Sequence, residues 1–350
     1  MDLAYRKKHL RFMFYIGLIL LFFIMILSAT FGTANISFTE SLRIILSKIY
    51  FINNFIPISS IPENHILIIL KIRLPRIVLS ALVGMGLSIV GASFQSIFKN
   101  PMADPYILGI SSGAALGASL GFVFKLENSS LSSAAIMIAA FIGSILSTIL
   151  VYNIARVKNK IPTTTLLLAG ISVNFLLSSL ISIIMVFNRD EVEQIVFWTM
   201  GSFSTANFNE IILLIPFLVI GITTLLCFSK DLNIIITGDE TAKNLGVEVE
   251  KVKKIVLVVS SMIVAACVSV SGIIGFVGLI IPHVVRIILG PNNRVLMPFS
   301  LVFGAGFMII SDTLARTIAS PAEIPVGSIT ALFGAPYFIY LLIKSKKKVM

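Results

Sequence analysis

The segment KIRLPR at residues 71–76 places three cations directly before an apolar run that begins at Ile77. The planar guanidinium fork of an arginine matches the two oxygens of a carboxylate, so Arg73 and Arg76 suit an acidic partner. The proline between them fixes the backbone where the apolar run starts. These residue types predict a docking surface for acidic side chains. The alternative is that the cations snorkel to lipid headgroups and anchor the following helix.

The rest of the sequence offers few groups for catalysis. It contains no GxxxxGK[ST] phosphate loop, so this chain cannot hydrolyse ATP by that route. No set of His, Cys or Asp has metal-ligand spacing, and no nucleophile is paired with a base. Cys227 and Cys267 fall within apolar runs, where we expect small buried side chains. We therefore predict neither an enzyme nor a metal site.

The composition indicates an all-α integral membrane protein. Of the 350 residues, 57% are hydrophobic and only 12% are charged. Long apolar runs recur along the whole chain, and about 20 residues of helix cross the hydrocarbon core of a bilayer. The runs are continuous rather than alternating, which argues against a transmembrane β-barrel. No stretch reads as a separate soluble domain, so we predict a single membrane-spanning domain over residues 1–350.

Ten transmembrane helices are predicted. They cover residues 12–31, 77–97, 106–124, 134–155, 166–187, 211–228, 255–272, 273–289, 295–311 and 326–343. The seventh and eighth form one apolar stretch that is too long for a single span, so we divide it at its glycines. The apolar patch at 195–203 is too short to cross and is expected to form a surface or re-entrant helix.

The distribution of charge predicts the orientation in the membrane. Ten spans place both termini on one side, and with the termini inside, 19 of the 27 Lys and Arg fall in cytoplasmic segments. This is the positive-inside pattern. It predicts a multi-pass protein of the bacterial plasma membrane with both termini in the cytoplasm and the KIRLPR segment outside. It also explains the net charge of +11 through contact with anionic lipid, without nucleic acid as a partner.

The predicted spans hold almost no ionisable side chain at mid-membrane depth. Ion-coupled transporters usually carry carboxylates or histidines at that depth, so this class is disfavoured. Sodium coupling through backbone carbonyls at broken helices remains open. An ion-coupled secondary transporter that acts alone is therefore the alternative function.

The third predicted span contains a regular row of small residues. The segment GISSGAALGASLG places Gly109, Gly113, Gly117 and Gly121 four residues apart, which puts them on one helix face. Such a face lets helix backbones approach closely. We assign the four glycines to helix packing rather than to a substrate path.

A charged loop at 229–254, between the sixth and seventh spans, carries ten charges and a short helical pattern. The residues that can cap this helix are Thr237 or Asp239 at its start and Gly246 at its end. Its apolar side chains Ala242 and Leu245 are expected on one side. We predict that this helix fits a socket on a cytoplasmic partner, and the alternative is an ordinary connector.

Eight segments in the same order resemble the FecCD-type permeases, the membrane subunits of ABC importers for iron–siderophores, haem and cobalamin. They are RLPR (73–76), GASFQSIFKNPMADPYILGISSGA (91–114), LLLAG (166–170), WTMGSF (198–203), GDETAKNLGV (238–247), SGIIGFVGLIIPHVVR (271–286), SDTLAR (311–316) and EIPVGSITALFGAPYFIYLL (323–342). The resemblance implies the type II ABC importer permease architecture, with ten helices per subunit and a second permease copy or paralogue. It also implies ATP-binding subunits inside and an extracellular or periplasmic substrate-binding protein. ATP and Mg would be bound by the partner ATPase, so no cofactor is expected in this chain.

The resemblance also implies roles for particular residues. Arg73 and Arg76 would pair with carboxylates of the binding protein, and so would Arg316 of SDTLAR. For Arg316, an ion pair with Asp312 one turn earlier on the same helix is the alternative.

On the cytoplasmic side, the helix at 238–247 resembles the coupling helix that fits a groove on the ATPase. Its residues assigned to coupling are Gly238, Asp239, Glu240, Ala242, Leu245 and Gly246. Thr163 and Thr164 match the position of the inner gate.

Two departures from the family pattern stand out. Met102 replaces the more usual leucine in NPLADP, and the segment 32–70 matches no part of the pattern. The resemblance predicts import of an iron chelate, with iron–siderophore first and haem or cobalamin as alternatives. The partner permease is an identical copy or a paralogue.

Overall fold

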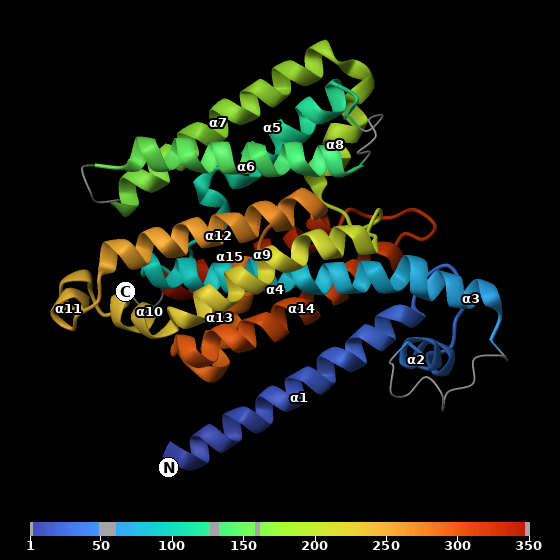
Figure 1. The fold of residues 1–350 in the computed structure, drawn as a ribbon, viewed down its shortest axis with the longest axis horizontal. Helices are drawn as coiled ribbons and strands as arrows, with labels where there is room; N and C mark the ends of the chain where they lie inside the picture. Colours follow the sequence, from blue (N-terminus) through green and yellow to red (C-terminus); the bar gives the residue numbers. More distant parts are fainter. Residues whose placement is uncertain (1–2, 49–60, 127–132, 158–161, 347–350) are drawn as a thin grey trace.

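The computed structural model describes residues 3–48, 61–126, 133–157 and 162–346, and these segments are mainly helical (Figure 1). The long apolar helices are α1 (Leu3–Thr30), α4 (Leu74–Ile97), α6 (Ser133–Ala155), α7 (Thr163–Phe187), α9 (Phe208–Cys227), α12 (Val249–Ser271) and α14 (Asn293–Thr317). The shorter apolar helices are α5 (Ile110–Val123), α13 (Val277–Leu289) and α15 (Val326–Lys346). The short helices α2 (Phe38–Leu46) and α3 (Glu63–Leu67) lie at one end of the bundle, and α10 (Ser229–Ile235) and α11 (Asp239–Asn244) lie at the other (Figure 1).

The helices agree with the predicted membrane spans. In the described part of the chain, 7 helices are long and apolar enough to cross a membrane, and they match seven of the predicted spans. The three shorter apolar helices fall on the other three. The all-helical fold is confirmed, whereas the number of ten crossings stays a prediction. The predicted break in the longest apolar stretch is confirmed, because α12 ends at Ser271 and α13 begins at Val277.

Two smaller predictions have different outcomes. Residues of the patch at 195–203 form most of the short helix α8 (Val192–Met200), and its position relative to the bilayer stays a prediction. Cys267 is buried in α12, as predicted, but Cys227 is exposed, so the prediction for Cys227 is wrong. Cys227 is the last residue of α9, where the chain turns into α10 and leaves this side chain uncovered.

Helix α4 lies at the centre of the bundle and packs against α9, α12, α13 and α14 (Figure 1). Small residues on α4 permit this central position, because they let neighbouring backbones approach closely. A Cβ atom on Gly84 would collide with the carbonyl of Gly304 on α14. One on Gly91 would collide with the carbonyl of Gly278 on α13. These two crossings fix α4 between its neighbours.

A π-helical segment, Ile68–Arg73, joins α3 to α4, so one continuous helix runs from Glu63 to Ile97. The π-turn closes hydrogen bonds over five residues instead of four and changes the direction in which the following side chains leave the helix. Pro75 lies two residues after this segment, in the first turn of α4, and cannot donate a backbone hydrogen bond there. As a result, Arg73 reaches α1 and Arg76 reaches α14.

All four glycines that were predicted to share a packing face lie against α6, but they approach it differently. A Cβ atom on Gly113 or Gly117 would collide with a backbone carbonyl of α6, whereas one on Gly121 would make ordinary contact with Ile136 at 3.5 Å. Gly109 does not lie in the helix. It precedes α5 with a left-handed φ of 74°, which favours glycine. The chain needs this reversal because a 3₁₀ turn, Pro105–Leu108, leads into α5.

Substitution of two of these glycines tests the packing of α5 on α6. Gly117→Ala is expected to destabilise the protein by about 1–3 kcal/mol, the usual cost of overpacking, because the carbonyl of Ala139 cannot move without its helix. Gly121→Ala is the matched control and is expected to leave stability nearly unchanged. The measurement is the unfolding temperature of the purified protein in detergent. Equal stability of the two variants would contradict the proposed difference in packing.

Candidate functional site

The end of α1 leaves backbone carbonyls without partners inside the helix, and two arginines bind them. The Nη1 atom of Arg73 donates to the carbonyls of Ala29 at 2.7 Å and Thr30 at 3.1 Å. Arg316, from α14, donates to the carbonyl of Ser28, and its Nη1 donates to that of Phe31 at 2.8 Å. The last four carbonyls of any α-helix lack intrahelical donors, and the helix dipole makes this end attractive to cations. The guanidinium groups therefore attach α1 to α4 and α14.

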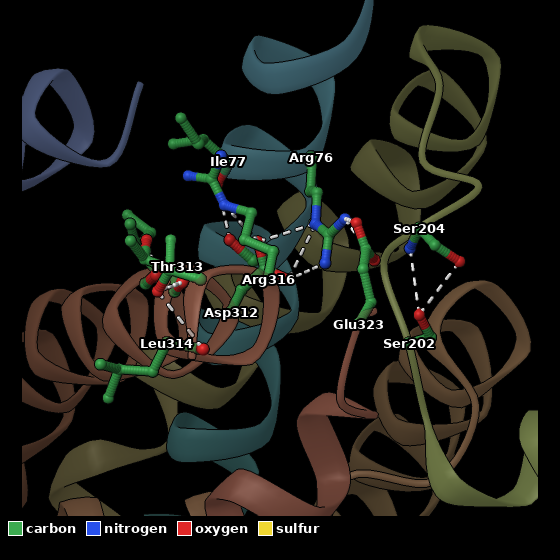
Figure 2. Close-up of polar contacts among 12 residues, drawn as sticks. Arg76, Ile77, Ser202, Ser204, Asp312, Thr313, Leu314, Arg316 and Glu323 are labelled. Carbon is green, nitrogen blue, oxygen red and sulfur yellow. Dashed lines mark hydrogen bonds and ion pairs between the residues drawn. The ribbon is translucent and has the colours of Figure 1, made fainter. Parts of the chain in front are cut away.

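Arg76 is held by two carboxylates from distant parts of the chain (Figure 2). Its Nε donates to Asp312 on α14 at 2.9 Å, and its Nη2 lies 2.9 Å from the same carboxylate. Its Nη1 donates to Glu323, in the loop between α14 and α15, at 2.9 Å. Asp312 is also 3.9 Å from the Nε of Arg316. We call this group the arginine cluster: Arg73, Arg76, Asp312, Arg316 and Glu323.

The arginine cluster is mostly shielded from solvent. Arg73 and Arg76 are 4% and 6% exposed, and Arg316 is 7% exposed. The alternative that Arg73 and Arg76 snorkel to headgroups is therefore wrong, because their guanidinium groups bind within the protein instead. The alternative ion pair between Arg316 and Asp312 is present at 3.9 Å. The docking role of the three arginines stays a prediction.

Sequence reasoning missed Glu323 and the α1 carbonyls as partners of the arginine cluster. Glu323 begins one of the eight segments that resemble the FecCD-type permeases, but 247 residues separate it from Arg76. No local spacing connects such positions. The side chain of Glu323 is 43% exposed, so it is the part of the cluster that an approaching molecule meets.

At the opposite end of the bundle, Asp239 joins three elements. Its Oδ1 accepts from Lys99, which follows α4, at 2.6 Å, and its Oδ2 accepts from Lys253 on α12 at 2.6 Å. Burial alone would raise the pKa of Asp239, but the hydrogen bonds and charges of the two lysines outweigh this and hold the pKa below its usual range. We call this group the lysine clamp: Asp239, Lys99 and Lys253. It fixes the start of α11 to α4 and α12.

The structure corrects several details of the predicted coupling helix. Its N-cap is Gly238, without a side-chain cap, rather than Thr237 or Asp239. The carboxylate of Asp239 binds the two lysines instead of the helix backbone. Gly246 ends the helix with a φ of 87°, as predicted.

The two apolar side chains of this helix do not share a side, so that prediction is wrong. Ala242 is fully buried against the protein's own core, whereas Leu245 is 65% exposed. Ala242 therefore holds α11 in place and Leu245 projects away from the bundle. Glu240 is also exposed.

The predicted gate residues lie at the beginning of α7, which starts at Thr163 after Pro162. Thr164 is exposed, and Thr163 is half-buried. Farther along α7, Phe175 is 73% exposed. The gate role of the two threonines stays a prediction.

Comparison with known proteins identifies the family. The model of the FecCD transport family matches residues 19–344. The chain belongs to the FecCD transport family. Its relatives include the cobalamin import system permease protein BtuC of Halobacterium salinarum, 43% identical over 81% of this chain and 75% of that protein. The Fe(3+)-citrate import system permease protein YfmD of Bacillus subtilis is 36% identical over 95% of each chain.

A solved structure supports the same conclusion. A metal-chelate type ABC transporter in an inward-facing conformation is 31% identical to this chain, with a TM-score of 0.81 over 95% of this chain and 99% of that one. This FecCD family member is therefore a membrane permease of the metal-chelate type of ABC importer, in which a partner ATPase uses the ATP. The relatives are transport permeases, and none of these names describes an enzyme.

The arginine cluster predicts unequal effects for its two carboxylates. Asp312→Asn is expected to destabilise this permease by about 3–5 kcal/mol, because it leaves Arg76 buried beside an uncharged partner. Glu323→Gln is the matched control, expected to cost at most about 1 kcal/mol because its side chain is largely solvated. Thermal unfolding of both variants in detergent measures the difference. A decrease in unfolding temperature for Glu323→Gln as large as that for Asp312→Asn would contradict this account.

Proposed function

We propose that this permease imports an iron chelate, with an iron–siderophore as the first candidate and haem or cobalamin as alternatives. The observation that carries the proposal is the match to the FecCD family over residues 19–344. Relatives named for iron(3+)-citrate and iron(3+)-hydroxamate support iron chelates, and the hemin permease HmuU of Yersinia pestis supports haem. Purifying the assembled transporter with its binding protein and identifying the bound compound by mass spectrometry tests the cargo.

We further propose that the end of the bundle with the lysine clamp faces the cytoplasm of a bacterial cell and that both termini lie there. Helix α1 begins at this end (Figure 1). The loop of 229–254, which includes α10 and α11, carries five of its ten charges as lysines. Cytoplasmic loops of membrane proteins carry an excess of such cations. The arginine cluster then lies at the outer face.

Helix α11 is proposed to be the coupling helix that receives movement from the ATPase. Leu245 supports this role because a 65% exposed leucine outside the membrane is available as an anchor for a socket. The lysine clamp supports it as well, since it joins the start of α11 to α4 and α12. A displacement of α11 would therefore be passed to the central helix.

A second permease copy or paralogue is proposed to pack along α7. Its exposed face alternates large apolar side chains such as Phe175 with the hydroxyls of Ser172, Ser179 and Ser182. Hydroxyl groups are unfavourable against lipid but suit the wall of a polar path between two subunits. Thr163 and Thr164 would form the inner gate at one end of this path.

Reconstitution separates this function from the alternative of an ion-coupled transporter that acts alone. Vesicles that contain the permease, its ATPase and its binding protein are expected to accumulate cargo only with ATP. Vesicles that contain the permease alone are expected to accumulate none under a sodium or proton gradient. Gradient-driven uptake by the permease alone would overturn the proposal.

A substitution at Leu245 tests the coupling helix in the same vesicles. Leu245→Asp is expected to weaken association with the ATPase on the order of tenfold, the effect of losing an anchoring side chain at an interface. Leu245→Met, which preserves volume and polarity, is the matched control and is expected to retain transport. Because Leu245 is exposed, neither variant should alter the unfolding temperature. Full ATP-driven transport by Leu245→Asp would contradict the assignment.

We propose that the arginine cluster docks the binding protein through Arg76, together with Arg73 and Arg316. The arginine cluster contains three guanidinium groups and only two carboxylates, which leaves an excess of positive charge beneath the exposed Glu323. A carboxylate of the binding protein would compete with Glu323 for the Nη1 edge of Arg76. Docking would then exchange one ion pair for another instead of burying a new charge.

This exchange predicts that removal of Glu323 improves docking. Glu323→Gln is expected to tighten association with the binding protein by about two- to fivefold, the range that one exposed ion pair is worth. The measurement is the dissociation constant on the detergent-purified transporter. Asp190→Asn, which removes an exposed carboxylate at the same end, is the control for a general charge effect. Weaker binding by Glu323→Gln would count against competition at Arg76.

A further inference from the structure

A crevice of about 390 Å³ opens between α1 and α14 at the end of the bundle that carries the lysine clamp. The two helices pack closely where α1 ends, since Ile26 and Ala29 are buried. They separate toward the start of α1, where Phe12 and Ile19 are exposed, and α1 leaves the bundle in this direction (Figure 1). The crevice occupies the wider part of this wedge.

The lining of the crevice changes from apolar to cationic toward its mouth. Its interior is formed by Phe14 on α1 and by Pro298 and Phe299 on α14. The rings of Phe14 and Phe299 meet edge to face at 5.4 Å and close its inner end. Arg11 lies about one helical turn before Phe14, and Arg294 about one turn before Pro298. The two helices therefore present one arginine each at the same level.

These two arginines have no acidic partner within the described part of the chain, unlike Arg76 and Arg316. Both are exposed. Two like charges that line one crevice repel each other, so an anion between them would be favourable for both. A phosphate group has the oxygen geometry that guanidinium forks bind.

We infer that this crevice binds a phospholipid with an anionic headgroup. The phosphate lies between Arg11 and Arg294, and an acyl chain follows the apolar interior along Phe14 and Phe299. A free phosphate would use only the mouth and leave the apolar interior unfilled, whereas a lipid matches both parts. Basic pockets between membrane helices at the cation-rich side are suited to such headgroups. Tyr15, also in the lining, fits the membrane interface at this level.

Lipid in this crevice would stabilise the weakly packed half of α1. Only 22% of the most apolar window of α1 is buried within the protein, compared with 83% for the helix that contains α4. The C-terminal end of α1 is held by the arginine cluster, and its N-terminal half by few contacts beyond the pair of phenylalanines. A bound lipid would connect the two helices across the gap.

The test uses the full-length permease purified in detergent. Native mass spectrometry measures retained phosphatidylglycerol and phosphatidylcholine, and thermal unfolding is followed with each lipid added. Wild-type protein is expected to retain phosphatidylglycerol preferentially and to be stabilised by it. Arg11→Gln and Arg294→Gln are each expected to weaken this binding by roughly fivefold, the contribution of one basic residue near anionic lipid. The double variant Arg11→Lys/Arg294→Lys is expected to retain most of the phosphatidylglycerol binding. This result would show that the fold tolerates changes at these positions.

The controls decide between the sources of the anion. Lys230→Gln removes a cation at the same end of the protein but outside the crevice, and it is expected to leave retention unchanged. Unchanged phosphatidylglycerol retention in the double glutamine variant would overturn the inference. Equal retention of the two lipids by wild-type protein would also overturn it. Stabilisation by inorganic phosphate to the same extent as by phosphatidylglycerol would assign the site to free phosphate and overturn the lipid.

Discussion

The end of helix α1 has to satisfy its backbone carbonyls inside a membrane protein, and this constraint organises one whole end of the bundle. Lipid offers no hydrogen bonds, so unpaired carbonyls must find donors within the protein. Arg73 and Arg316 supply them to the residues from Ser28 to Phe31. Each guanidinium brings a charge that is itself unfavourable when buried. Asp312 offsets part of that charge and binds Arg76 as well, which joins α1, α4 and α14 through one set of interactions.

Ion pairs stabilise both ends of the bundle, but they hold different elements there. The arginine cluster is buried and holds long helices together, and only Glu323 reaches the surface. The lysine clamp is half-exposed and holds a short helix of six residues, which has little stability of its own. Helix α4 connects them, because Arg76 lies near its start and Lys99 directly follows its end. Forces applied at either end therefore act on the same central helix.

The sequence predicts the helices well and the contacts between them poorly, for physical reasons. Span length and apolar composition follow from the thickness of the bilayer, so the spans and the break before Val277 are readable from one chain. The partners of Arg76 lie 236 and 247 residues away, and no periodicity connects them. The prediction that Ala242 and Leu245 share a side failed because a helix of six residues can turn either face inward. Only its packing decides which face is buried. Gly109 faces α6 as predicted, but it lies before the helix because a turn precedes α5.

The π-helical segment before Arg73 limits how this family member can vary in length. Each residue added to or removed from a helix rotates everything beyond it by about 100°. A deletion that converted residues 68–73 to regular α-helix would turn Arg76 away from Asp312 while Arg73 stayed near α1. Insertions and deletions between this segment and the first turn of α4 should therefore separate Arg76 from Asp312. The irregular turn thus sets the distance along the chain between the arginine that binds α1 and the arginine that binds Asp312.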